Sequence, residues 1–287
     1  MRVIKRKKGK KEYFYLQHSI RKKNKVVTKE KYLGTDIPKN ISEIISNFTR
    51  KIEPNQYSVL EKIRKNFQTE WRKLPDSVKA KHKEEISIAF TYNTNAIEGS
   101  KITLSETRGI LHDHISPNKP IKDVKETEAH NKIFLEMLEK REALTIRTFL
   151  EWHKEIFAET KPDIAGKFRT YLVTIAGHIP PDWRKVRREM KNITLYIKRS
   201  KRDGRNPVEL AARVHYRFEK THPFGDGNGR IGRLLMNCIL WHSKYPMLII
   251  ENKRKVAYYK AFKRGEDGFV RYFMRRYLKA HKKLTGG

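Results

Sequence analysis

Cysteine is almost missing from this sequence of 287 residues, which contains only Cys238. A single cysteine excludes an internal disulfide framework and is typical of a reducing compartment. Cys238 lies in the apolar run 234–240, so we expect a buried structural thiol rather than a nucleophile. The cysteine usage therefore indicates a cytoplasmic protein.

Long apolar runs are missing as well. The basic segment 1–11 is followed by the mixed segment 12–18, which is no uninterrupted signal-peptide core. Near the end, the apolar stretch 238–250 is broken by His242, Lys244 and Pro246 and is too short to span a bilayer. We therefore expect neither export nor a membrane partner.

Acidic residues are scarce relative to basic ones. The chain has 32 Asp and Glu against 65 Lys and Arg, a formal charge of +33. This excess fits contact with an acidic partner such as nucleic acid, and it fits a solvated basic surface equally well. Charge alone leaves that choice open.

The length predicts one main domain with a smaller addition. Residues 1–40 carry β-prone pieces at 13–16 and 26–28 between charged turns, which favours a small basic hairpin-like appendage. A helical pattern begins near residue 41. We therefore divide the chain into the appendage 1–40, a helical segment 41–100 and a core 101–287.

The fold class is predicted to be mainly α. Apolar spacing indicates helices near 83–98, 122–140, 145–158, 207–220, 254–264 and 267–282. Thr103 and Glu106 form a capping box at the start of another helix, and Asn206 before Pro207 marks the start at 207. The β-branched run 170–175, followed by Gly177 and Pro180, predicts an extended hairpin within 166–181.

One loop, 221–233, concentrates residues that suit phosphate chemistry. Gly227 and Gly229 allow a tight turn whose N–H groups point inward, an anion nest at the start of the next helix. Asp226 supplies a carboxylate oxygen beside that nest, as Mg²⁺ bridging phosphates requires.

The charged side chains around the nest complete this pattern. Arg230 and Arg233, three residues apart in the first helical turn, share a face and can bind phosphate oxygens. His222, at the end of the preceding helix, is positioned as a general base. The loop therefore predicts a polyphosphate site with a base beside it.

The loop His222-x-Phe224-x-Asp226-Gly227-Asn228-Gly229-Arg230-x-x-Arg233 resembles the complete signature of Fic domains, H-x-F-x-D/E-G-N-G-R-x-x-R. The resemblance covers roughly residues 85–280. It implies a Fic-type helical bundle with a small β-hairpin flap, and it implies an enzyme that transfers AMP from ATP to a Ser, Thr or Tyr hydroxyl of a target protein, with ATP and Mg²⁺ required.

The resemblance also implies a role for each residue of the signature. His222 would deprotonate the target hydroxyl and Asp226 would hold Mg²⁺ against the phosphates. Backbone at Gly227 and Gly229, together with Asn228, would line the anion hole, and Arg230 and Arg233 would bind the β and γ phosphates.

The segment from Thr94 to Gly99 resembles the inhibitory motif of the family, S/T-x-x-x-E-G/N. In relatives the glutamate of this motif pairs with the second arginine of the signature. The resemblance therefore implies that Glu98 pairs with Arg233 and displaces the γ-phosphate, so that the enzyme is autoinhibited.

Two further pieces resemble family elements. Gly166-Lys167-Phe168-Arg169-Thr170 is similar to the segment that leads into the flap, which implies that a target protein docks on 171–181 by strand addition. Tyr258 and Tyr259 lie near the position where relatives contact adenine, and core packing is the competing explanation for both.

Several alternatives stay open at this level. Within the family, the chain could remove AMP from a modified protein with Glu98 orienting water, or transfer UMP or phosphocholine. Outside it, a nucleic-acid-binding regulator would use the basic N-terminal unit, with the Fic core as a nucleotide sensor. The identity of the target and the oligomeric state, a dimer included, are not encoded in these motifs.

Overall fold

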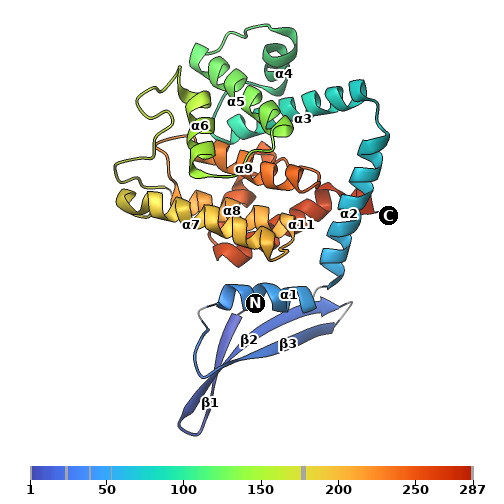
Figure 1. Cartoon of the computed structure of the whole chain (residues 1–287), viewed down its shortest axis with the longest axis vertical. Coiled ribbons are helices and arrows are strands. Elements are labelled where there is room, and N and C mark those ends of the chain that lie inside the picture. The colour runs from blue at the N-terminus through green and yellow to red at the C-terminus, as the bar shows by residue number, and fades with distance from the viewer. Residues whose placement is uncertain (1, 23–24, 39, 53, 176–178, 286–287) are drawn as a thin grey trace. The chain divides into compact units, whose positions relative to one another are not determined.

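The computed structural model describes residues 2–22, 25–38, 40–52, 54–175 and 179–285 (Figure 1). The chain divides into two compact units, Met1–Glu61 and Lys62–Gly287. The division of the chain into the parts 1–40, 41–100 and 101–287 stays a prediction. Among the described residues, no helix is both long and apolar enough to cross a membrane.

The first unit contains a three-stranded antiparallel sheet, ordered β1 (Arg2–Lys8), β2 (Lys11–Lys22) and β3 (Lys25–Gly34), and helix α1 (Ile41–Ile52). Gly9, at φ +62°, occupies the two-residue turn between β1 and β2, where a positive φ favours glycine. The expected hairpin strands at 13–16 and 26–28 are therefore parts of β2 and β3. Strand β1 was not predicted from the sequence, because its many charged residues obscure the alternation of apolar and polar side chains that is typical of a strand.

The second unit is helical, and helix α2 (Pro54–Lys73) enters it from the first. Its helices are α3 (Asp76–Ile97), α4 (Leu104–Arg108), α5 (Ile121–Glu139), α6 (Ile146–Phe157), α7 (Trp183–Arg202), α8 (Pro207–Thr221), α9 (Asn228–His242), α10 (Lys255–Phe262) and α11 (Gly265–Ala280). A π-helical turn, Gly109–Asp113, continues α4, and short 3-10 turns occupy Asn252–Arg254 and Lys282–Thr285.

Helices α8 and α9 form the centre of this unit. They pack against each other, α7 and α11 pack against α8, and α5 and α3 contact α9 (Figure 1). Every residue of α9 from Asn228 to Leu240 is buried. The loop that joins α8 to α9 is therefore fixed from both sides by the core.

Local capping explains where several helices begin. The Thr103 side chain accepts a hydrogen bond from the Glu106 N–H, and the Glu106 carboxylate accepts one from the Thr103 N–H, so the predicted capping box is confirmed. The Asn206 side chain accepts from the Val208 N–H with Pro207 in the first turn, as predicted.

Helix α7 was not predicted from the sequence. Its buried stripe of Val186, Met190, Ile193 and Ile197 has helical spacing, but Lys and Arg fill the positions between them. The expected hairpin at 166–181 also differs in the structure. Only Ile175 has a β-bridge in the described part of this segment, which is otherwise irregular, and the predicted flap residues 176–178 lie outside the described residues.

Candidate active site

The loop between α8 and α9 has a backbone that few other sequences could adopt. His222 ends α8 in the left-handed region at φ 46°, and Gly227 caps α9 at φ 73°. A Cβ at Gly227 would overlap the Phe157 ring. The Asn228 amide accepts from the Phe224 N–H at 2.8 Å and donates to the Phe224 carbonyl at 2.9 Å, which closes the turn.

A buried histidine outside the signature also holds this loop. His153 Nδ1 accepts from the Gly166 N–H at 3.0 Å, so its proton is on Nε2, which donates to the Asp226 carbonyl at 3.1 Å. Its ring stacks on Phe224 with 3.9 Å between centroids. Burial lowers the pKa of His153 to about 4, so the ring is neutral at pH 7 and keeps this tautomer.

Arg169 links the segment 171–181 to His222. Its Nε donates to the His222 carbonyl at 2.8 Å, and its guanidinium also donates to the carbonyls of Tyr171 and Pro181 at 2.8 and 2.6 Å. The two ends of the segment 171–181 are therefore held together beside His222.

Two carboxylates and two cations form a network beside the loop. Asp226 Oδ2 lies 2.7 Å from Lys161 Nζ and 3.6 Å from Arg230 Nη2, and Glu126 Oε1 lies 2.9 Å from the same lysine. Glu126 Oε2 also pairs with Arg230 Nη1. Burial alone would raise the pKa of Asp226, but the Lys161 hydrogen bond and the Arg230 charge hold it below its usual value. Both carboxylates are therefore ionised at neutral pH.

Glu98 and Arg233 form an ion pair across the site. Glu98 Oε1 lies 2.5 Å from Arg233 Nη2, which also donates to the Thr94 carbonyl at 3.2 Å. The Arg233 side chain is 1% exposed and that of Glu98 is 28% exposed. A Cβ at Gly229 would overlap Glu98 Oε1, so the carboxylate lies directly over the glycine-rich turn.

The end of α3 explains why Glu98 points into the site. Gly99 has φ 100°, the Ser100 N–H donates to the Asn95 carbonyl at 3.0 Å, and the Gly99 N–H donates to the Ala96 carbonyl at 3.2 Å. These two bonds are those of a Schellman motif, which ends a helix and requires a residue with positive φ. Gly99 thus sets the direction of the chain immediately after Glu98.

Comparison with known proteins shows to which family the loop and its surroundings belong. The model of the Fic/DOC family matches residues 143–240, which contain the loop. Residues 143–240 belong to the Fic/DOC family. The protein adenylyltransferase Fic of Nematostella vectensis is 33% identical over 189 residues, 64% of this chain and 44% of the relative. That of Drosophila ananassae is 32% identical over 203 residues, 67% of this chain and 40% of the relative. The chain thus spans less than half the length of these relatives.

Solved structures confirm the Fic-type fold. Fic-1 from C. elegans superposes with a TM-score of 0.70 at 26% identity, covering 88% of this chain and 79% of that one. A Fic domain containing signaling protein from Bacteroides thetaiotaomicron gives a TM-score of 0.67 at 25% identity, covering 79% of this chain and 98% of that one. The mainly helical architecture predicted from the sequence is therefore confirmed.

The two tyrosines near the Fic loop occupy different environments. Tyr258 is buried and its hydroxyl lies 2.7 Å from His215 Nε2. Tyr259 is 46% exposed. Burial, followed by the charge of Glu98, raises the pKa of Tyr259 to about 12. Only the Tyr259 ring thus reaches the surface, and adenine contact by either residue stays a prediction.

A cavity of about 200 Å³ joins these parts of the Fic domain. Glu98 and Gly99 line it on one side, and Glu126, Asp226 and Arg230 line it on the other. Of the residues predicted for the site, Glu98, Gly99, Asp226 and Arg230 line this cavity, whereas its lining among the described residues does not include His222 or Arg233. Glu126, Lys161 and His153 were not predicted as site residues, because each lies far from the loop in the chain and in no recognised motif.

Proposed function

We propose that this chain is a protein adenylyltransferase, which transfers AMP from ATP to a Ser, Thr or Tyr hydroxyl of another protein. The observation that carries the proposal is the α8–α9 loop, where His222 ends α8, Gly227 caps α9, and the side chains of Asp226 and Arg230 lie 3.6 Å apart. The matched relatives are named protein adenylyltransferases, which supports the same reaction.

The reaction needs a base, an anion site and a leaving-group site. The His222 imidazole accepts the proton of the target hydroxyl, and the hydroxyl oxygen attacks the α-phosphorus of ATP. The bond between the α-phosphorus and the oxygen that bridges it to the β-phosphorus breaks, and pyrophosphate leaves. N–H groups at Gly227 and Gly229 stabilise the charge on the phosphate oxygens, and Arg230 and Arg233 bind the leaving pyrophosphate.

The donor set fits a magnesium ion. Asp226 and Glu126 present carboxylate oxygens to the small polar cavity, and Mg²⁺ prefers one or two carboxylates together with phosphate oxygens and water. Lys161 Nζ binds both carboxylates in the structure, within 2.9 Å of each, so a cation already suits this position. We propose Asp226 as the metal ligand. When bound, Mg²⁺ neutralises the charge of the phosphates.

Autoinhibition is the regulatory part of the proposal. The Glu98 carboxylate occupies Arg233 and lies over Gly229, where the terminal phosphate of ATP would bind. A carboxylate at this point repels phosphate and removes an arginine donor from it. The Thr94 carbonyl accepts a hydrogen bond from Arg233 and Gly99 ends α3, so both help to hold Glu98 and Arg233 together in the inactive state.

The target protein is proposed to dock on the flap. In the described part of 171–181, Leu172 and Ile179 are strongly exposed. The backbone there is irregular apart from the β-bridge at Ile175, and we propose that an extended segment of the target pairs with it. Arg169 places this segment beside His222. The single thiol, buried at Cys238, supports the proposal that this chain is cytoplasmic.

Two alternatives have an observation in their favour. Removal of AMP is supported by Glu98, because its carboxylate is close enough to the nest to orient a water molecule there. A nucleic-acid-binding role of the first unit is supported by its sheet, on which Arg6 stacks over Tyr15 and Tyr32 packs against the same ring.

Labelling with ATP tests the proposal. Wild type, Glu98→Gly and the double variant Glu98→Gly/His222→Ala are incubated with Mg²⁺ and ATP labelled on the α-phosphate. We expect Glu98→Gly to label itself or a lysate protein more strongly than wild type and the double variant to stay unlabelled. Glu98→Gly labelling at or below the wild-type level would refute the inhibitory pair, and labelling without His222 would refute the base.

A further inference from the structure

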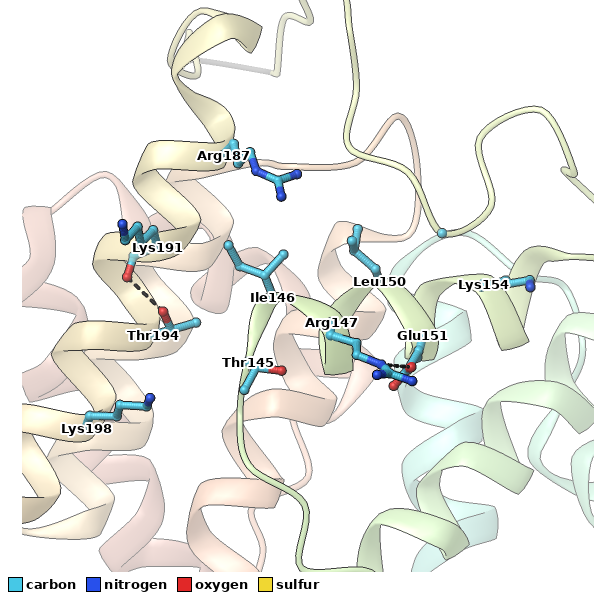
Figure 2. Close-up of a pocket in the computed structure, with 11 residues that line it drawn as sticks. Thr145, Ile146, Arg147, Leu150, Glu151, Lys154, Arg187, Lys191, Thr194 and Lys198 are labelled. Atoms are coloured by element: carbon cyan, nitrogen blue, oxygen red, sulfur yellow. Dashed lines mark hydrogen bonds and ion pairs between the residues drawn. The ribbon is translucent and has the colours of Figure 1, made fainter.

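A second hollow lies outside the polar cavity, between α6 and α7 (Figure 2). It has a volume of about 700 Å³, and we call it the basic groove. Ile146 and Leu150 of α6 form its apolar part, and Gly166 lies at one side. Five cationic side chains line it: Arg147, Lys154, Arg187, Lys191 and Lys198.

The cations of the basic groove are largely uncompensated. Its one acidic lining residue, Glu151, is engaged by Arg147 at 2.6 Å. Within the described part of the chain, no carboxylate lies within ion-pair distance of Lys154, Arg187, Lys191 or Lys198. Like charges so arranged repel one another, and a bound anionic group relieves that repulsion.

The basic groove adjoins the catalytic loop. Gly166, which lines the groove, donates its N–H to His153, and the opposite nitrogen of the same ring donates to the Asp226 carbonyl. One imidazole thus separates the groove from the loop. The flap begins five residues after Gly166, and α7 begins directly after the flap. A molecule in the groove therefore lies beside a substrate segment on the flap.

We propose that the basic groove binds an acidic segment of the target protein, with an apolar side chain against Ile146 and Leu150. This rests on the proposed function and adds the class of target. Arg187, Lys191 and Lys198 follow one face of α7 over roughly 16 Å, at 1.5 Å per residue. That length matches about five residues of extended chain.

The lining favours a peptide over a nucleic acid. Single-stranded nucleic acids are held by aromatic side chains that stack on the bases. Among the described residues, none that lines the basic groove is aromatic, and aliphatic carbon lies between its cations. Aspartate and glutamate side chains around one apolar residue complement this arrangement.

Binding of a short peptide to the full chain tests the proposal without ATP. The probe is a fluorescein-labelled peptide of acidic residues around a single leucine, with a matched peptide in which amides replace the acids. Three double variants are compared with wild type by fluorescence anisotropy. Lys191→Glu/Lys198→Glu, which we call the groove reversal, reverses two of the five positive charges of the groove. Lys191→Arg/Lys198→Arg preserves its charge, and Lys185→Glu/Arg199→Glu makes the same charge change at exposed positions of α7 outside the groove.

We expect the groove reversal to weaken binding of the acidic peptide at least about tenfold, since each exposed ion pair changes affinity roughly two- to fivefold and each reversal also adds a repulsion. The arginine variant and the reversal outside the groove stay within about twofold of wild type. The amide peptide does not bind.

Three outcomes overturn the proposal: no binding of the acidic peptide to wild type, equal loss in both charge-reversal variants, or loss of labelled oligothymidylate binding in the groove reversal without loss of peptide. ATP labelling of the same variants in the Glu98→Gly background reports transferase activity separately. Groove-dependent binding without labelling would contradict the proposed function and leave the groove assignment standing.

Discussion

Replacing Glu98 by glutamine should expose how much the inhibitory ion pair contributes to folding. The substitution keeps the shape of the side chain and removes its charge, so the buried Arg233 guanidinium loses its ionised partner while the Thr94 carbonyl still accepts a hydrogen bond from it. Removing one member of a fully buried pair costs about 3–5 kcal/mol. Because the Glu98 carboxylate is 28% exposed, we expect a smaller loss, about 1–3 kcal/mol.

A neighbouring carboxyl limits this loss. Burial raises the pKa of Glu219 to about 8, so the group is largely protonated at pH 7. The charge of Glu98 contributes to that rise and Arg233 opposes it. Without Glu98, the pKa of Glu219 falls and part of its charge becomes available to Arg233, which is the physical reason for the lower end of the range.

Equilibrium urea unfolding measures the effect, with Glu85→Gln as the matched control. Glu85 pairs with Arg108 at the surface, where both side chains are exposed and solvent screens the pair, so its loss should destabilise the chain less than the loss of Glu98. At an ATP concentration about one hundred times the Kd of Glu98→Gln, binding should stabilise that variant by about 2.7 kcal/mol. The same concentration should stabilise wild type by less, because Glu98 weakens ATP binding. The reasoning is refuted if Glu98→Gln is no less stable than Glu85→Gln and ATP stabilises wild type equally.

Further predictions concern the loop, the carboxylates and pH. Gly227→Ala should lower stability and abolish labelling, because φ is positive and the Cβ meets Phe157; normal unfolding and activity would contradict this. Lys161→Gln should lower the Mg²⁺ concentration needed for half-maximal labelling, because a competing cation is removed from Asp226; an unchanged Mg²⁺ dependence argues against the proposed ligand. Below pH 6.5 the free energy of unfolding should fall by up to about 4 kcal/mol per pH unit, and a flat urea profile between pH 7 and pH 5 would be the contrary result.

The sign of the pH prediction follows from five buried groups. Burial lowers the pKa of four histidines to about 3 or about 4, so the unfolded chain binds protons from pH 6.5 downward while the folded chain does not. Glu219 opposes them, because its raised pKa keeps the folded form protonated and adds stability as the pH falls from about 8 toward 4.5. Because four histidines destabilise the folded chain in acid and Glu219 alone of these groups stabilises it, the free energy of unfolding falls as the pH falls. The histidines are His130, His153, His215 and His281.

Local rules account for the parts of the molecule that could be predicted. The cap at Asn206, the box at Thr103 and the glycine turn each depend on neighbours within a few residues, and the structure forms all three. The pairing of Glu98 with Arg233 joins residues 135 apart, and only the family resemblance suggested it before the structure gave the 2.5 Å contact.

Contacts between distant elements account for what could not be predicted. His153 and Lys161 are ordinary residues in sequence, and only the packing of α6 against the loop brings them to Asp226. Helix α7 was not predicted, because the Lys and Arg residues between its buried apolar residues obscure their helical spacing. Three cations of this helix, Arg187, Lys191 and Lys198, line the basic groove.

A crystal of the Glu98→Gly variant soaked with a non-hydrolysable ATP analogue and Mg²⁺ tests the central claim most directly. We predict density for the triphosphate along Gly227–Gly229, with the α-phosphorus facing His222 and the terminal phosphate at Arg233, where Glu98 lies in the wild-type structure. A triphosphate bound away from this loop, with the loop itself well ordered, would contradict the account.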